Sequence, residues 1–122
     1  MYILDTNCAI YYLKNEAPVA DILEPIINNR QAGVSTITEI ELFSFPYMDE
    51  RQAEAASKFL ETVYITVLDS KIARLAGKLR SLYKIPLADS AIAATALYLR
   101  STLLTRNIKD FKRIPDLKLQ KI

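Results

Sequence analysis

The sequence has 122 residues, the length of one domain, and 51% of them are hydrophobic, which argues against a disordered chain. It contains no histidine, one cysteine and two glycines. This composition excludes Ser-His-Asp and Cys-His catalysis, zinc sites built on imidazole, an internal disulfide and a glycine-rich phosphate loop. The net charge of +2 is unremarkable. We therefore expect a single domain spanning residues 1–122.

The sequence contains few features that indicate a cellular compartment. No stretch approaches the ~18–20 apolar residues of a membrane span, and the N-terminus lacks a basic region followed by an apolar signal core. The single cysteine, Cys8, is compatible with a reducing compartment and is expected to be a small core residue. The sequence thus predicts a cytoplasmic protein with no membrane partner.

Short apolar runs alternate with amphipathic stretches along the chain. In order, the pattern predicts a strand at 2–4, helices at 7–14 and 17–29, a strand at 32–35, helices at 36–45 and 49–62, a strand at 63–68, helices at 69–83 and 89–100, a strand at 102–105, a loop with room for one helical turn at 106–115, and a strand at 117–120. Pro25 is expected to kink or restart the second helix. Strands alternating with helices predict an α/β fold, with a mostly parallel sheet covered on both faces.

Right-handed crossovers place the carboxyl ends of parallel strands at one edge of the sheet, where ligands gather in open α/β folds. Asp5 follows the first strand and Asn107 follows the strand at 102–105. The helices that begin near Thr36 and Asp89 are expected to start near the same edge. The topology therefore predicts one site built from side chains that are distant in the sequence.

Four carboxylates are candidates for this site: Asp5, Glu41, Asp89 and Asp110. Each also has a purely structural interpretation. Asp5 could cap the helix that follows it, and Asp89 could act only as an acid in the first turn of a helix. Asp110 could cap a turn or pair with a neighbouring lysine.

Two glutamates compete for one position. Thr36 and Glu39 have the spacing of a capping box, in which Glu39 bonds the Thr36 amide, so Glu39 is the weaker candidate. Glu41 lies between Ile40 and Leu42, and a carboxylate in apolar surroundings is costly unless it is paired or metal-bound. We therefore favour Glu41.

Clustered carboxylates repel one another, and some would be protonated at neutral pH without a cation. A set of oxygen ligands without His or Cys suits Mg²⁺ or Mn²⁺ rather than zinc. Such ions activate water and stabilise the leaving oxygen in displacements at phosphorus. The cluster is therefore compatible with a Mg²⁺- or Mn²⁺-dependent displacement at phosphorus.

Four segments also carry a resemblance to a known family. They are Asp5-Thr6-Asn7, Thr38-Glu39-Ile40-Glu41-Leu42, Pro86-Leu87-Ala88-Asp89-Ser90-Ala91-Ile92-Ala93-Ala94-Thr95-Ala96 and Leu103-Leu104-Thr105-Arg106-Asn107-Ile108-Lys109-Asp110-Phe111. In this order, over essentially the whole chain, they resemble the motifs of PIN-domain ribonucleases. More closely, the chain resembles the toxin half of VapBC toxin–antitoxin pairs.

This resemblance implies a sheet of strand order 3-2-1-4-5. It implies that Asp5 and Asp89 are the main metal ligands, with Glu41 as the acid of the second motif. The fourth position is open, because Asn107 stands where many PIN domains carry an Asp and Asp110 follows three residues later. Thr6, Asn7, Thr105 and Asn107 would support the ligands by hydrogen bonds.

The resemblance further implies Mg²⁺-dependent endonucleolytic cleavage of RNA, a homodimer, and inhibition by a cognate antitoxin whose C-terminal segment enters the active-site groove. Residues 106–122 hold six cations and two acids, which suits an RNA phosphate backbone. An apolar patch at Phe43, Phe45, Tyr47 and Met48 could serve a dimer or antitoxin interface, or ordinary core packing.

Two other functions compete with the nuclease. The first is a catalytically silent PIN-like module that binds RNA or protein without cutting; the set Asp5, Glu41 and Asp89 argues against it. The second is a phosphatase with an Asp nucleophile. Such enzymes need another Asp two residues after the first, where this chain has Asn7.

Overall fold

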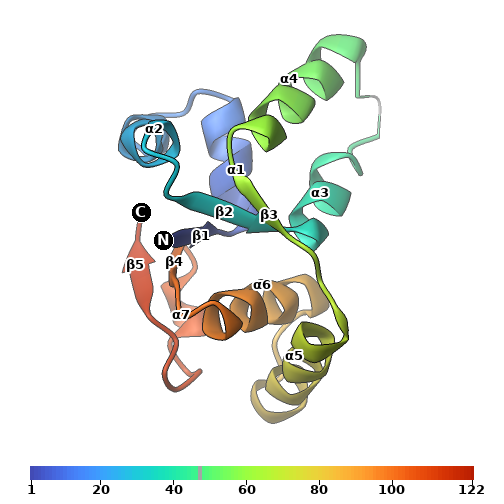
Figure 1. The fold of residues 1–122 in the computed structure, drawn as a ribbon, viewed down its shortest axis with the longest axis vertical. Coiled ribbons are helices and arrows are strands. Elements are labelled where there is room, and N and C mark those ends of the chain that lie inside the picture. Colours follow the sequence, from blue (N-terminus) through green and yellow to red (C-terminus); the bar gives the residue numbers. More distant parts are fainter. Residues whose placement is uncertain (47) are drawn as a thin grey trace.

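The computed structural model describes residues 1–46 and 48–122, an alternation of short strands and helices (Figure 1). The elements are β1 (Tyr2–Leu4), α1 (Thr6–Leu13), α2 (Val19–Asn28), β2 (Ala32–Ser35), α3 (Thr36–Leu42), α4 (Glu50–Glu61), β3 (Tyr64–Thr66), α5 (Ser70–Tyr83), α6 (Leu87–Tyr98), β4 (Thr102–Thr105), α7 (Ile108–Phe111) and β5 (Leu119–Lys121). The strands of the described residues form one parallel sheet of order β3-β2-β1-β4-β5. This confirms both the expected α/β fold and the strand order.

The sheet separates two hydrophobic cores because successive strand residues point to opposite faces. On β1, Leu4 packs into the core beneath α1, α2 and α4, whereas Ile3 packs into the core beneath α5, α6 and α7. Leu104 and Leu103 of β4 divide in the same way, and all four side chains are fully buried. The result is three layers, with α4 and α5 at opposite ends of the view in Figure 1.

Side-chain caps fix where several helices begin. Asp5, Ser35 and Asp69 each accept a hydrogen bond from a backbone amide in the first turn of α1, α3 and α5. Asp49 and Gln52 form a reciprocal capping box at the start of α4, at 2.7 and 3.1 Å. Asp5 directly follows β1 and Ser35 is the last residue of β2, so α1 and α3 begin at the carboxyl edge of the sheet.

Several predicted boundaries shift. Pro25 lies inside α2, which runs through it as one helix rather than restarting. Helix α3 ends at Leu42 instead of residue 45, and α6 begins at Leu87 instead of residue 89, directly after Pro86. The loop at 106–115 contains the short helix α7, as expected. Within the described residues, no helix has the length and apolarity that crossing a membrane requires.

Candidate active site at the carboxyl edge of the sheet

Asp5 is held from two sides at the end of β1. Its Oδ1 accepts the backbone N–H of Cys8 at 2.8 Å, which makes Asp5 the N-cap of α1. Its Oδ2 accepts the hydroxyl of Thr105, from the end of β4, at 2.5 Å. Only 6% of Asp5 is exposed. Asp5 is thus a helix cap, as its structural interpretation predicted, and each oxygen keeps a lone pair for a further partner.

Glu41 is tied to the same edge through two threonines. The Thr6 hydroxyl, one residue after Asp5, donates to Oε1 of Glu41 at 2.5 Å, and the Oγ1 atoms of Thr6 and Thr38 lie 3.1 Å apart. Since the Thr6 proton is given to Glu41, Thr38 is the donor to Thr6. Thr38 is fully buried. No role for Thr38 follows from our sequence analysis, although its position three residues before Glu41 puts both on one face of α3.

The predicted capping box at Thr36 and Glu39 is wrong. The N-cap of α3 is Ser35, whose Oγ accepts the amide of Ile37 at 3.2 Å. The Thr36 hydroxyl instead accepts the amide of Leu68 at 3.1 Å and joins α3 to the chain after β3. The helix therefore begins one residue earlier than the box requires, and that argument against Glu39 is lost.

The apolar surroundings predicted for Glu41 are also wrong, because its neighbour Ile40 is 63% exposed. Glu41 is half-buried and has a polar partner in Thr6. The preference for Glu41 over Glu39 rests instead on electrostatics at Asp89.

Asp89, in the first turn of α6, shows that the four carboxylates face one region. Burial, followed by the negative charges of Asp5, Asp110 and Glu41 in that order, together raise its pKa from 3.8 to about 6. Like charges raise a carboxyl pKa only when they lie close by. The acids nominated from the sequence therefore converge, and Glu39 does not contribute to the raised pKa of Asp89.

Asn107 and Asp110, the two candidates for the fourth position, are bonded to each other. The Asn107 side-chain amide donates to Oδ2 of Asp110 at 2.9 Å, and its backbone N–H donates to the hydroxyl of Thr105 at 2.9 Å. The charge of Asp110 is one of the three that raise the pKa of Asp89, after that of Asp5. The arrangement therefore places the Asp110 carboxylate toward the cluster, with Asn107 as its donor. Asn7 is exposed at the start of α1.

The donor chemistry fits a divalent cation. Every candidate is an oxygen ligand, and their mutual repulsion is what a cation such as Mg²⁺ relieves. Among the described residues, however, no three acidic or sulfur side chains are already spaced to hold one ion. Asp5, Glu41 and Asp110 are each held by a hydrogen bond from a different neighbour.

Two further side chains border the site. The guanidinium of Arg106, directly after β4, lies 4.5 Å above the ring centroid of Tyr11 on α1. Cys8 is fully buried and donates to the Leu104 carbonyl at 3.4 Å. Burial raises the pKa of its thiol, and the charge of Asp5 adds to this. Cys8 is therefore a core residue, as predicted, and not a nucleophile.

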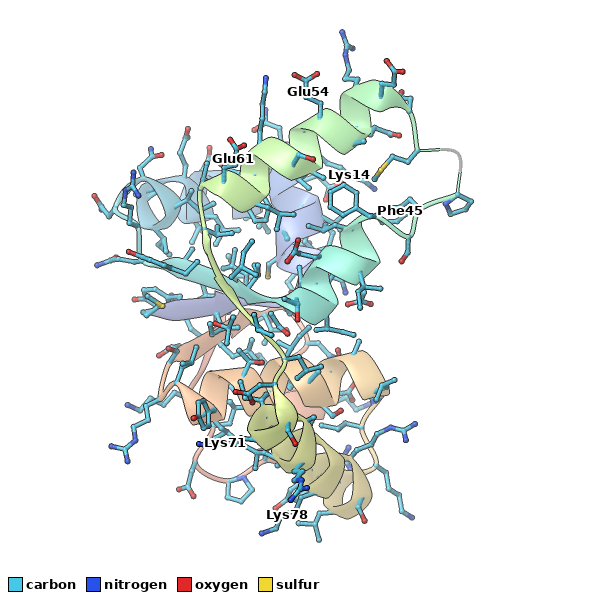
Figure 2. All side chains as sticks on the ribbon, turned by 45° about the vertical axis from the view of Figure 1, so that its right-hand side comes forward. Lys14, Phe45, Glu54, Glu61, Lys71 and Lys78 are labelled. Carbon is cyan, nitrogen blue, oxygen red and sulfur yellow. The ribbon has the colours of Figure 1, made fainter. Side chains whose placement is uncertain are left out.

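An apolar groove of about 390 Å³ lies apart from the carboxylates, between α1, α4 and the chain that joins α3 to α4. Ile10, Leu13, Phe45 and Met48 line it, and Figure 2 shows Lys14 and Phe45 at this end of the molecule. Phe45 and Met48 belong to the predicted apolar patch, whereas Tyr47 lies outside the described residues. The patch is thus partly a groove wall rather than core.

The fold is a parallel α/β sheet with acidic side chains at its carboxyl edge, and the PIN domain family matches residues 2–117. The chain belongs to the PIN-domain family. Ribonuclease VapC19 of Mycobacterium tuberculosis (strain CDC 1551 / Oshkosh) is 32% identical to it over 123 residues, which cover 96% of this chain and 97% of the relative. The chain is thus a homologue of the VapC ribonucleases.

Solved structures agree with this assignment. The structure of VapBC2 from Rickettsia felis bound to a promoter DNA fragment matches with a TM-score of 0.85 and 31% identity, covering 99% of this chain and 98% of that one. A toxin–antitoxin complex from Klebsiella pneumoniae matches with a TM-score of 0.82 and 32% identity, covering 96% and 95%.

Proposed function

We propose that this protein is a Mg²⁺-dependent endoribonuclease that acts as the toxin of a toxin–antitoxin pair. The observation that supports the proposal is that Thr105 and Thr6 hold Asp5 and Glu41 at one edge of the sheet, near Asp89, whose pKa is raised by burial and by the charges of Asp5, Asp110 and Glu41. A homologue named as a ribonuclease covers nearly the whole chain, which supports RNA as the substrate.

In this proposal Asp5, Asp89 and Glu41 hold the metal, and Asp110 acts beside them. When bound, Mg²⁺ supplies charge neutralisation and activation of the attacking water at phosphorus. The threonines keep two of these carboxylates in place: Thr105 fixes Asp5 and Thr6 fixes Glu41. Such fixed neighbours limit the reorganisation that catalysis would otherwise require.

The substrate and partner surfaces follow from charge and shape. The cations of residues 106–122, beginning with Arg106 at the site edge, would bind the phosphate backbone. The apolar groove lined by Phe45 and Met48 would receive a segment of the antitoxin; the matching complexes that contain toxin and antitoxin support such a partner. We also propose a homodimer in the cytoplasm.

The central test is Asp5→Asn, assayed for Mg²⁺- or Mn²⁺-dependent cleavage of RNA. Asn is as good an N-cap as Asp, so α1 should form normally while a metal ligand is lost. We expect cleavage to disappear and the circular dichroism spectrum to be retained. Asp21→Asn, an exposed acid in the first turn of α2, is the matched control. Undiminished cleavage by the Asp5 variant would refute the assignment.

A catalytically silent PIN-like module remains the alternative, and the lack of a preformed ligand trio among the described residues gives it some support. Titration with Mg²⁺ and Mn²⁺ separates the two functions. A nuclease of the proposed kind should melt at a higher temperature with either ion, because the ion binds only the folded state. An unchanged melting temperature with both ions would favour the module.

A further inference from the structure

Charge is divided unevenly between the two halves of this fold. Residues 1–69 contain eleven acids and four cations, whereas residues 70–122 contain twelve cations and three acids. The first part builds α1 to α4, and the second builds α5, α6 and α7 with the strands β4 and β5. Because α5 and α6 cover one face of the sheet and α1, α2 and α4 cover the other (Figure 1), the molecule has an acidic layer and a basic layer.

The cations are densest on α5 and the turn after it. Residues 70–88 contain no acid and five cations: Lys71, Arg74, Lys78, Arg80 and Lys84. All five are exposed, and within the described part of the chain none has a carboxylate within 4.0 Å. Figure 2 shows Lys71 and Lys78 at the opposite end of the molecule from Glu54 and Glu61 of α4. This surface therefore carries positive charge that no internal ion pair neutralises.

A shallow hollow of about 490 Å³ lies at the C-terminal end of α5. Its lining consists of Gly77, Arg80, Ser81, Lys84, Ile85 and Leu87. Both charged members are cations, and a Cβ at Gly77 would meet nothing within 4 Å, so the hollow is open there. Residues 84–86 connect α5 directly to α6, whose first turn carries Asp89. The hollow thus lies at the end of the helix pair that bears the carboxylate site.

We propose that this hollow and the exposed face of α5 bind the phosphate backbone of the RNA away from the bond that is cut. The inference rests on the proposed function and deepens it by naming where the substrate is held. A helix of 14 residues is about 21 Å long. That length matches about six nucleotides at the ~3.4 Å spacing of a stacked strand.

Charge favours RNA over a second copy of the chain as the occupant. A two-fold symmetric dimer brings the same patch of both copies together, so Arg80 and Lys84 would face the basic surface of the second copy, with no acid between residues 70 and 88 to pair with. Like charges held close are destabilising. A polyanion has the opposite requirement, and exposed Leu87 can contact a ribose or a base edge beside the cations.

The test uses the variant Arg80→Gln with Lys84→Asn, placed in the Asp5→Asn protein so that bound RNA is not cut. Asn is chosen at position 84 because Lys84 has a left-handed backbone with φ 52°, which Asn adopts readily. Affinity for a single-stranded RNA is measured between 50 and 200 mM salt. Affinity falls as salt rises, and each lost phosphate contact reduces the magnitude of the slope of log affinity against log salt by about 0.7. We expect the magnitude of the slope to fall by about 1.4.

The matched control is Arg51→Gln with Lys58→Gln on α4, which removes the same charge from the acidic layer and should leave the slope unchanged. A second variant, Lys71→Gln with Arg74→Gln and Lys78→Gln, should reduce the magnitude of the slope by about 2. This variant provides the test if the first variant does not fold. Melting curves establish folding for each protein.

Equal slopes in all the variants overturn the inference. A variant that changes the sedimentation coefficient but not the slope also overturns it, because the surface then joins copies of the chain. Cleavage of RNA by the unsubstituted protein is measured in parallel. Normal cleavage with unchanged slopes refutes this inference alone, whereas absence of both cleavage and binding refutes the proposed function as well.

Discussion

Replacing Asp89 by Asn tests whether the carboxylates repel one another in the metal-free protein. Burial and the charges of Asp5, Asp110 and Glu41 raise the pKa of Asp89 from 3.8 to about 6. One pKa unit corresponds to about 1.4 kcal/mol, so the ionised Asp89 would destabilise the fold by about 3 kcal/mol above pH 6. Asp89 is partly exposed, and solvent screening reduces this figure. The dipole of α6 also favours a negative charge in its first turn by about 0.3–1 kcal/mol. We expect Asp89→Asn to gain about 1–2 kcal/mol of stability.

The expected gain depends on pH in a defined direction. The folded-state pKa of Asp89 lies above its unfolded value. The stability of the unsubstituted protein is therefore unaffected by this group below about pH 4, where Asp89 is protonated, and decreases as the pH rises to about 6 and Asp89 ionises. The difference between variant and unsubstituted protein should therefore be near zero at pH 4 and greatest above pH 6. Other titrating groups are common to both proteins and largely cancel.

The assay is urea unfolding in EDTA from pH 4 to 8, with Glu24→Gln, an exposed acid on α2, as the control that should show no such pH dependence. Added Mg²⁺ should reverse the order of stability, because only the unsubstituted protein keeps its full ligand set. A variant that is less stable than the unsubstituted protein at pH 7.5 in EDTA, or a difference that does not change with pH, would refute the reasoning.

Three smaller predictions concern groups around the site and the caps. Thr105→Val removes the hydroxyl that donates to Oδ2 of Asp5 and should cost about 1–3 kcal/mol in urea unfolding, while Thr105→Ser should restore most of it; equal stability of the Val variant would contradict this. Asp49→Ala removes the capping box of α4 and should cost about 1 kcal/mol, with Asp49→Asn milder; an equal loss in both would point away from the cap. Cys8 should resist a thiol reagent in the native protein and react on unfolding, because burial raises its pKa; rapid native labelling would show it is accessible.

The convergence of the site could be predicted because it depends only on topology. Asp5 comes directly after β1 and Asp89 opens a helix that the parallel sheet returns to the same edge. Strand and helix periods are strong signals in this chain, and the handedness of crossovers leaves few arrangements. Side chains separated by 84 positions could therefore be assigned to one site without their contacts being known.

The predictions that were wrong, the N-cap of α3 and the surroundings of Glu41, depend on contacts of single residues. Ser35 and Thr36 are both good N-caps, and which one begins α3 depends on Thr36 bonding the amide of Leu68, a contact from a distant strand end. The exposure of Ile40 depends on which face of the short helix α3 packs. A hydrophobic pattern of seven residues is too short to predict which face of a helix is buried. The basic hollow on α5 likewise depends on which side of that helix packs against α6.

The threonines give two carboxylates of this cluster, Asp5 and Glu41, hydrogen-bond donors that Asp89 lacks. Asp5 accepts from Thr105 and from a backbone amide, and Glu41 accepts from Thr6. No hydrogen bond in the described structure is donated to the side chain of Asp89, which Pro86 precedes without a side-chain cap. Since donated hydrogen bonds stabilise an anion and burial alone destabilises it, Asp89 carries the repulsion of its neighbours uncompensated. A divalent cation at this carboxylate would compensate the repulsion, so we expect neutralising Asp89 to stabilise the metal-free protein and to abolish the proposed cleavage.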